Sequence, residues 1–444
     1  MVQKTKKMKT IFKILIVLLT LQLNAQQVLT KKQALEFALE NNYGIKLANN
    51  NIKIAKNNTS IYNSRKLPTA SFNAGANYNN SNLDIDNQDG TSQKINGAET
   101  KTYNAAVNVN YILYDGLGRK YNYQQLKQTY NLSELQAKET IENTYLQLFN
   151  VYYQIARLTE NTVNLSEALS ITKQRLLRAK YKYEYGQANK LEILNAEVDI
   201  NNDSINLINA NQQVKNAKRD LNLILNTKNN NLDYKVDTNI DFNDLLNYKD
   251  LLQKAKENNT IIKQTEQNIA ISELNLKINK ASLLPTIGLS SSYGWNKSDN
   301  PSTSFQAGSV ITGLNAGINL SWNIFDGGNT KTRINNTKIV IENQQIVKQQ
   351  QTDNLETTLH NTWDAYKNQL YILKAQEQNV GTAENNFERT QERFKIGQVS
   401  SVEFRQAQIN LLNSKTAVNN AKYDAKLIEI QLLQLSGQLL DVEF

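Results

Sequence analysis

Four segments of the chain alternate between apolar or small residues and polar ones, which is the pattern of β-strands. They cover about residues 70–79, 103–113, 287–295 and 314–324. In the last segment one face carries Leu, Ala, Ile and Trp, and the other carries uncharged Asn, Gly and Ser. Strands of this length, with aromatic residues near their ends, are typical of membrane barrels that face lipid outside and water inside. A half-buried soluble sheet gives the same alternation and remains the alternative.

The stretches between paired strands have a different composition. Residues from about 80–101 and 296–308 are rich in Asn, Asp, Ser and Gly. Such clusters are typical of loops, so we expect two solvent-exposed loops there.

Two very long helices are expected, over about residues 119–184 and 330–395, because these stretches contain no Pro and almost no Gly. Each would be roughly 100 Å long at 1.5 Å per residue. Apolar residues recur at spacings of three and four, as in coiled coils, and a second, weaker stripe would let a helix contact neighbours on both sides. Helices with two such seams can close into a tube. An ordinary antiparallel bundle explains the heptads equally well but not the strands.

The chain is internally duplicated, because two sets of short motifs recur in one order. We expect a first repeat over 26–235 and a second over 236–444, each with a helix, two strands and a long helical hairpin. The matching motifs are Leu67-Pro68 with Leu284-Pro285, Tyr114-Asp115-Gly116 with Phe325-Asp326-Gly327, and Tyr185-Gly186-Gln187 with Ile396-Gly397-Gln398.

Residues 1–25 are expected to be a secretory signal peptide. Basic residues precede an apolar run that ends at Leu23-Asn24-Ala25, where a small residue suits cleavage. A membrane anchor is the alternative, but the run is shorter than the roughly 20 apolar residues of a spanning helix. The protein is therefore expected to be exported.

Charge and composition exclude several classes of function. The net charge is +9, but the first 25 residues hold five lysines and no acidic residue, which leaves +4 spread along the rest. A nucleic-acid binder is not expected from this distribution. With no Cys, a single His and two Met (Met1 and Met8, both in the leader), the chain offers no set of catalytic or metal-binding side chains. We expect no enzyme activity, no cofactor and no metal.

Four strands cannot close a membrane barrel, since single-chain barrels need about eight. Open strand edges in lipid would leave backbone groups unpaired, at several kcal/mol each. Other copies of the chain must therefore supply the missing strands. This argument requires a cyclic oligomer and does not fix its order.

Taken together, these features resemble the TolC-type outer-membrane efflux family over essentially the whole mature chain. The repeated Leu-Pro strand entries, the Asp-Gly strand-to-helix turns and the aromatic-x-x-Gly hairpin turns carry the resemblance. It implies a mixed α/β membrane protein: a homotrimer with a shared twelve-stranded barrel in the outer membrane and a tunnel of twelve helices across the periplasm. It also implies a periplasmic adaptor and an inner-membrane pump, of the resistance-nodulation-division or ABC type, as partners.

The resemblance further implies a gate at the periplasmic hairpin tips. The turns would lie at Gly186 and Gly397, with Tyr183 and Phe394 in the aromatic position before them. Acidic gate residues would be Glu192 and Glu403.

This sequence departs from the family's gate pattern at two positions. Val399 stands where a basic gate residue is expected, and Gln406 replaces a second acidic residue. Lys190 is an alternative partner for the acidic residues.

Helix capping is the competing interpretation of the two gate glutamates. Asn189 and Glu192, like Ser400 and Glu403, have the spacing of a capping box. Gly186 and Gly397 would then serve as left-handed residues that end a helix.

The expected function is passive export, and the resemblance favours small-molecule efflux. Protein secretion with an ABC exporter is the alternative within this class, because the cargo is set mainly by the pump. An oligomeric coiled-coil adhesin is the alternative from another class.

Overall fold

The computed structural model describes residues 28–228, 232–242, 246–302 and 304–442. The expected signal peptide, 1–25, lies outside the described residues. The chain forms two compact units, each built from separate parts of the sequence. Unit 1 comprises Met1–Asn49, Gln136–Ile262 and Gln351–Phe444, and unit 2 comprises Asn50–Leu135 and Lys263–Gln350.

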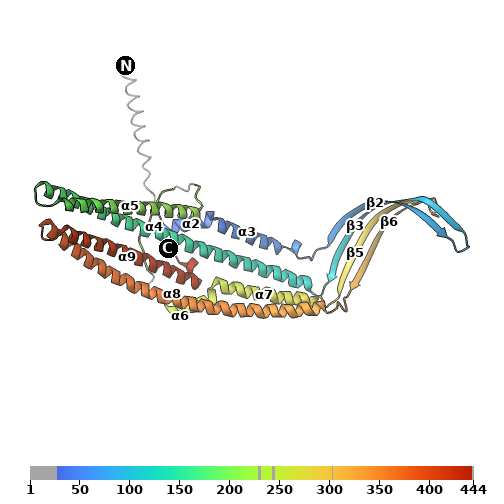
Figure 1. The fold of residues 1–444 in the computed structure, drawn as a ribbon. Helices are drawn as coiled ribbons and strands as arrows, with labels where there is room; N and C mark the ends of the chain where they lie inside the picture. The colour runs from blue at the N-terminus through green and yellow to red at the C-terminus, as the bar shows by residue number, and fades with distance from the viewer. Residues whose placement is uncertain (1–27, 229–231, 243–245, 303, 443–444) are drawn as a thin grey trace, which may run out of the picture. The chain divides into compact units, whose positions relative to one another are not determined.

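One order of elements occurs twice along the chain (Figure 1). In each half two short helices precede two strands, a very long helix and a shorter one. The first half contains α2 (Lys31–Asn41), α3 (Tyr43–Asn58), β2 (Thr69–Asp86), β3 (Ser92–Tyr114), α4 (Gly118–Glu184) and α5 (Lys190–Leu225). The second contains α6 (Tyr248–Asn258), α7 (Thr260–Ala281), β5 (Thr286–Asp299), β6 (Gly308–Ser321), α8 (Asn329–Lys395) and α9 (Ser401–Leu435). The repeat boundaries, 26–235 and 236–444, stay a prediction.

The helices agree with the sequence pattern. α4 and α8 are 67 residues each, within a residue of the expected limits. Among the described residues, no helix has an apolar stretch long enough to cross a bilayer.

Unit 2 contains a four-stranded antiparallel sheet with the order β2-β3-β5-β6. Its register lines up side chains of one kind across all four strands. One row is Phe72, Val107, Tyr293 and Leu314, and the neighbouring row is Ser71, Asn108, Ser292 and Asn315. Because successive residues point to opposite faces, one face is apolar and the other is polar.

The apolar face of the sheet is uncovered. Phe72 is 69% exposed and Leu314 is 70% exposed. A half-buried soluble sheet would pack these side chains against a core, so the soluble alternative does not describe this sheet.

The expectation of a loop over 80–101 is wrong. β2 continues to Asp86 and β3 begins at Ser92, so the two strands form one long hairpin. Its outer part is held by backbone pairing and by exposed polar contacts, including a 3.0 Å Lys94–Asp84 ion pair. Both faces are solvated there, so no hydrophobic alternation marks the strands. The second loop is shorter than expected, since β5 ends at Asp299 and β6 begins at Gly308.

Unit 1 has an aromatic core between α4 and α9. Phe149, Tyr152, Tyr153 and Tyr423 are each at most 1% exposed. The Tyr152 hydroxyl donates to the Leu29 carbonyl at 2.7 Å and accepts from the Asp237 amide at 2.9 Å. It thereby holds β1 (Val28–Leu29) and β4 (Lys235–Val236), which pair in parallel. Burial raises the pKa of Tyr152 to about 12.

Candidate functional site

The two hairpin turns, at the free ends of the long helices in unit 1, have the same backbone geometry. Gly186 and Gly397 adopt φ values of +70° and +78°. The Gln187 amide donates to the Lys182 carbonyl at 2.7 Å, and the Gln398 amide donates to the Arg393 carbonyl at 2.8 Å. These bonds close a Schellman motif, which suits Gly. The prediction that both glycines are left-handed residues ending a helix is confirmed.

The two predicted capping boxes differ. At α9 the box is complete: the Glu403 amide donates to Ser400 Oγ at 3.2 Å, and the Ser400 amide donates to the Glu403 carboxylate at 2.7 Å. The bond from the Ser400 amide, followed by that from its hydroxyl, lowers the pKa of Glu403. At α5 the prediction is wrong, because the described Asn189 side chain makes no capping hydrogen bond. Here only the backbone carbonyl of Asn189 accepts from the Glu192 amide, at 3.4 Å.

The two aromatic residues before the turns lie in different surroundings. Phe394 is 6% exposed and stacks on Phe404, with ring centroids 4.6 Å apart. Val399 packs against this cluster, so an apolar residue fits where the family pattern expects a basic one. Tyr183 is 47% exposed.

The remaining predicted gate residues are accessible. Glu403, Gln406 and Lys190 are exposed, and Glu192 is half-buried. Gln406 donates to the Asn410 side chain at 2.8 Å. Across the described residues no ion pair joins Lys190 to either glutamate. The structure thus brings these residues to the tips without linking them to one another.

A polar cluster that the sequence analysis did not single out links the two hairpins. Arg405 of α9 donates to both carboxylate oxygens of Asp203 on α5, at 2.6 and 2.9 Å. Its Nε lies 3.6 Å from Asp199 Oδ1, and Asp199 also pairs with Arg175 of α4. We call the set the Arg405 cluster; its members are Arg405, Asp199, Asp203, Arg175, Thr172 and Gln408.

The Arg405 cluster is largely buried, with Arg405 and Asp199 partly exposed, and it is neutral overall. Thr172, Arg175, Asp203 and Gln408 are each at most 4% exposed, and the two arginines balance the two aspartates. The Thr172 hydroxyl donates to Asp203 at 2.7 Å. Buried charges are tolerated when they are paired and hydrogen-bonded, and removal of one partner is costly. The cluster is therefore a specific contact that holds α9 against α4 and α5.

A second contact joins the hairpins closer to the turns. The Arg178 guanidinium of α4 donates to the Lys395 carbonyl at 3.0 Å. The same guanidinium and the Lys182 ammonium lie 5.8 and 5.4 Å from the centre of the Phe394 ring. The end of α8 is thus held by basic side chains of α4.

The junctions between helices and strands in unit 2 contain the predicted residues. Pro68 and Pro285 directly precede β2 and β5. Asp115 accepts from the Arg119 amide at 2.9 Å, and Asp326 accepts from the Thr330 amide at 2.8 Å, so each caps the helix that follows.

Both Asp-Gly turns need their glycines, because Gly116 and Gly327 have φ values of +66° and +67°. A Cβ at Gly116 would also lie 2.6 Å from the Ala281 carbonyl.

No metal site was found among the described residues, which contain no group of three or more His, Cys, Asp or Glu side chains placed to hold an ion.

Comparison with known proteins identifies the family. The family model described as "Outer membrane efflux protein" matches residues 34–227 and 251–438, which together make up most of the chain. The chain belongs to the outer membrane efflux protein family. The family confirms the expected localisation in the outer membrane and agrees with the prediction that the chain is not an enzyme.

Two curated relatives of this efflux protein match part of it. Outer membrane protein TolC of Vibrio cholerae is 24% identical over 169 residues, 37% of this chain and 38% of the relative. Outer membrane efflux protein BepC of Brucella suis is 22% identical over 165 residues, 37% of this chain and 35% of the relative. The matches thus span little more than a third of each relative's length.

Solved structures match the efflux protein over nearly its whole length. The Campylobacter jejuni CmeC outer membrane channel has a TM-score of 0.76 at 18% identity, with 92% of this chain and 86% of that chain covered. The outer membrane protein VceC of Vibrio cholerae has a TM-score of 0.72 at 14% identity, with 92% and 96% covered. These similarities confirm the predicted fold class, with long helices and four strands in each chain.

Proposed function

We propose that this protein is the outer-membrane channel of a tripartite export system and passively conducts what an inner-membrane pump delivers. The observation that carries the proposal is the sheet of unit 2, with one exposed apolar face, one exposed polar face and an open edge on each side. Such a sheet suits a barrel wall between lipid and a water-filled lumen.

Closure of the barrel requires further copies of the chain. In the described part of the chain the edge strands β2 and β6 each have a single neighbour. We infer a homotrimer with a shared twelve-stranded barrel, which satisfies both edges and follows the resemblance to the TolC type. Closure by two further copies avoids unpaired backbone groups in lipid, which cost several kcal/mol each.

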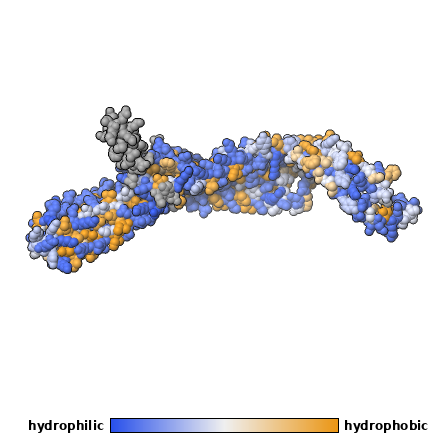
Figure 2. Space-filling view, turned by 90° about the horizontal axis from the view of Figure 1, so that it is seen from above, coloured by the Kyte–Doolittle hydropathy of each residue, from blue (hydrophilic) through white to orange (hydrophobic). Residues whose placement is uncertain are grey.

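An apolar stripe on α5 supports assembly in unit 1. Figure 2 shows apolar side chains on the surface of the helical hairpins. On α5 they recur at spacings typical of a coiled coil, and each is 47–66% exposed; they are Leu191, Leu194, Val198, Ile205 and Ile208. Because a stripe of this kind packs against another helix in coiled coils, we assign it to a neighbouring copy.

The partners proposed for the trimer are a periplasmic adaptor and an inner-membrane pump. A passive channel of this kind depends on a pump to energise transport. Small-molecule efflux is the cargo class that we propose, and the family description names efflux without naming a cargo.

We place the gate at the hairpin tips, with the Arg405 cluster as the contact that holds the hairpins together. Release of Arg405 from Asp203 would free α9 from α5. The exposed Glu403 and Tyr183 and the half-buried Glu192 are then side chains available to line the opening, while Phe394 stabilises its own hairpin.

Single-channel recording tests the proposal. Purified protein extracted from the outer membrane is inserted into planar bilayers, with heat-unfolded protein as the control. Stepwise ionic currents that require native protein are expected. Native protein that inserts stably and never conducts, including with Arg405→Ala, would contradict the proposal.

A further inference from the structure

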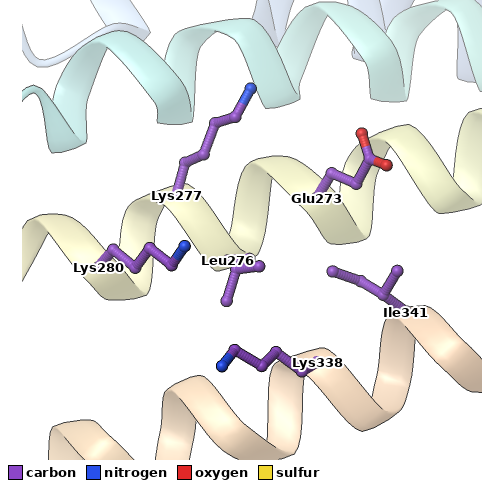
Figure 3. A pocket seen from close by; sticks show the side chains of 6 residues that line it. All are labelled: Glu273, Leu276, Lys277, Lys280, Lys338 and Ile341. Carbon is purple, nitrogen blue, oxygen red and sulfur yellow. The ribbon is translucent and has the colours of Figure 1, made fainter.

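A basic groove lies between α7 and α8 in unit 2. It has a volume of about 410 Å³, and its lining includes three lysines and one glutamate (Figure 3). Lys280 and Lys338 extend into the space between the two helices, with Leu276 and Ile341 beside them. Glu273 and Lys277 point away from this side, toward the neighbouring helix. The open side of the groove thus presents two ammonium groups and two apolar side chains.

The two ammonium groups are not neutralised. Lys280 and Lys338 are exposed, and within the described residues neither forms an ion pair. Ten residues further along α8, Lys348 pairs with Glu266 at 2.7 Å. With three lysines and one glutamate in its lining, the groove carries a net positive charge, whereas Lys348 further along the same helix is paired.

More basic residues occur in the segments of unit 2 near the ends of the strands. Asp115 and Asp326 lie in the same segments, where each caps a helix. The additional basic residues are Arg65, Lys66, Lys120, Lys127, Lys331 and Arg333.

The position of the groove relative to the membrane follows from Trp322. Its indole N–H donates to the Leu283 carbonyl at 3.1 Å, three residues after Lys280. Trp is enriched at membrane–water interfaces, where its ring lies at the level of the headgroups. Lys280 is therefore expected at headgroup depth, just outside the hydrocarbon region that the apolar face of the sheet spans.

We infer that this groove binds the phosphate of an anionic phospholipid from the leaflet on the helical side of the membrane. Lys280 and Lys338 would contact the phosphate, and Leu276 and Ile341 would contact the upper part of the acyl chain. Basic residues at a membrane surface attract anionic lipid with about 1 kcal/mol each. The inference rests on the membrane placement proposed above.

Native mass spectrometry of the full-length protein tests the inference. The protein is equilibrated with phosphatidylglycerol and phosphatidylethanolamine, and bound lipids are counted for each oligomer. Wild type is expected to retain phosphatidylglycerol preferentially. Two lost contacts of about 1 kcal/mol each predict roughly 30-fold weaker retention in Lys280→Gln/Lys338→Gln.

Two control variants show whether lipid is lost through the missing charges or through a general effect of substitution on folding. Lys348→Gln, which removes an ion-paired lysine of the same helix, should retain lipid like wild type. Lys280→Arg/Lys338→Arg should also retain it, because both charges remain.

Three outcomes would overturn the inference. They are equal retention of the two lipids, retention unchanged in the double Gln variant, and complete displacement by inorganic phosphate, which would indicate a site for free anions. The mass reports the oligomer before lipid is counted. A protein that remains a soluble monomer would overturn the channel proposal as well, whereas an inserted oligomer without lipid preference would overturn this inference alone.

Discussion

Arg405 is the side chain whose removal should have the largest effect on the hairpin tips. Its guanidinium contacts Asp203 twice, and the Asp203 side chain is 6% exposed. Loss of one partner of a buried ion pair costs about 3–5 kcal/mol. We therefore expect Arg405→Ala to lower the apparent melting temperature and to raise the basal conductance in bilayers.

Two further variants serve as controls for Arg405→Ala. One changes a residue of the same hairpin, and the other changes Asp203, the ion-pair partner of Arg405. Arg389→Ala removes an exposed arginine of α8 and should leave conductance unchanged. Adding Asp203→Asn to Arg405→Ala should recover part of the lost stability, because no buried carboxylate is then left unpaired. A basal conductance of Arg405→Ala equal to that of wild type would exclude the cluster from the gate.

Glu403 has two roles that different substitutions can separate. Glu403→Gln removes the charge and keeps a side chain that can bond the Ser400 amide, whereas Ser400→Ala removes the cap and keeps the charge. If Glu403 lines the channel, the Gln variant should reduce cation selectivity and the Ser400 variant should not. Ser400→Ala should cost about 0.5–2 kcal/mol of stability. Equal selectivity in both variants, measured by reversal potential, would leave Glu403 as a cap only.

Glu142 predicts a pH dependence in unit 1. It is 4% exposed and accepts from the Thr260 hydroxyl at 3.0 Å, and burial raises its pKa above the ordinary value of 4.5. Because the folded state holds its proton more tightly than the unfolded state, stability is lost as pH rises above 4.5. Glu142→Gln, which is neutral at every pH, should raise the apparent melting temperature at pH 7 and leave it nearly unchanged at pH 4.

The exposed Glu36 provides the control for this pH dependence. Glu36→Gln should not change the melting temperature at either pH. A lower melting temperature for Glu142→Gln than for wild type at pH 7 would contradict the raised pKa of Glu142.

The hairpin turns show how one residue type acts differently in different elements. Gly397 has φ +78°, whereas Gly381 lies inside α8, with nothing among the described residues within 4 Å of a Cβ at either position. Gly397→Ala should destabilise by about 1–2 kcal/mol through the left-handed backbone. Gly381→Ala should stabilise by up to about 1 kcal/mol through helix propensity. Thermal melting that shifts both variants in one direction would contradict this account.

The elements with strong local signals could be predicted from sequence. The limits of α4 and α8 follow from the absence of Pro and the periodic apolar residues, and the turn glycines follow from their repeated motif. The outer part of the β2–β3 hairpin could not, because both its faces are solvated and no hydrophobic alternation marks the strands.

The Arg405 cluster could not be found from local sequence for a different reason. Arg405 and Asp203 are 202 residues apart and belong to different hairpins. The available signal was the pair Asp199 and Asp203, which lie four residues apart and so on one side of α5. Without the packing of α9, that pair looks like an ordinary solvated helix face.

At the scale of the whole molecule, the open sheet edges and the exposed α5 stripe call for the same partner. In unit 2, neighbouring copies of the chain would pair with the backbone groups of the edge strands β2 and β6. In unit 1, a neighbouring copy would cover the exposed apolar side chains of α5. Two independent surfaces that call for the same neighbour strengthen the proposal of a shared barrel.

The native mass of the protein extracted from the outer membrane tests this central claim most directly. With detergent mass subtracted, the account predicts three protomers in one particle. A stable single protomer would contradict the shared barrel, because four strands with two open edges cannot close in lipid.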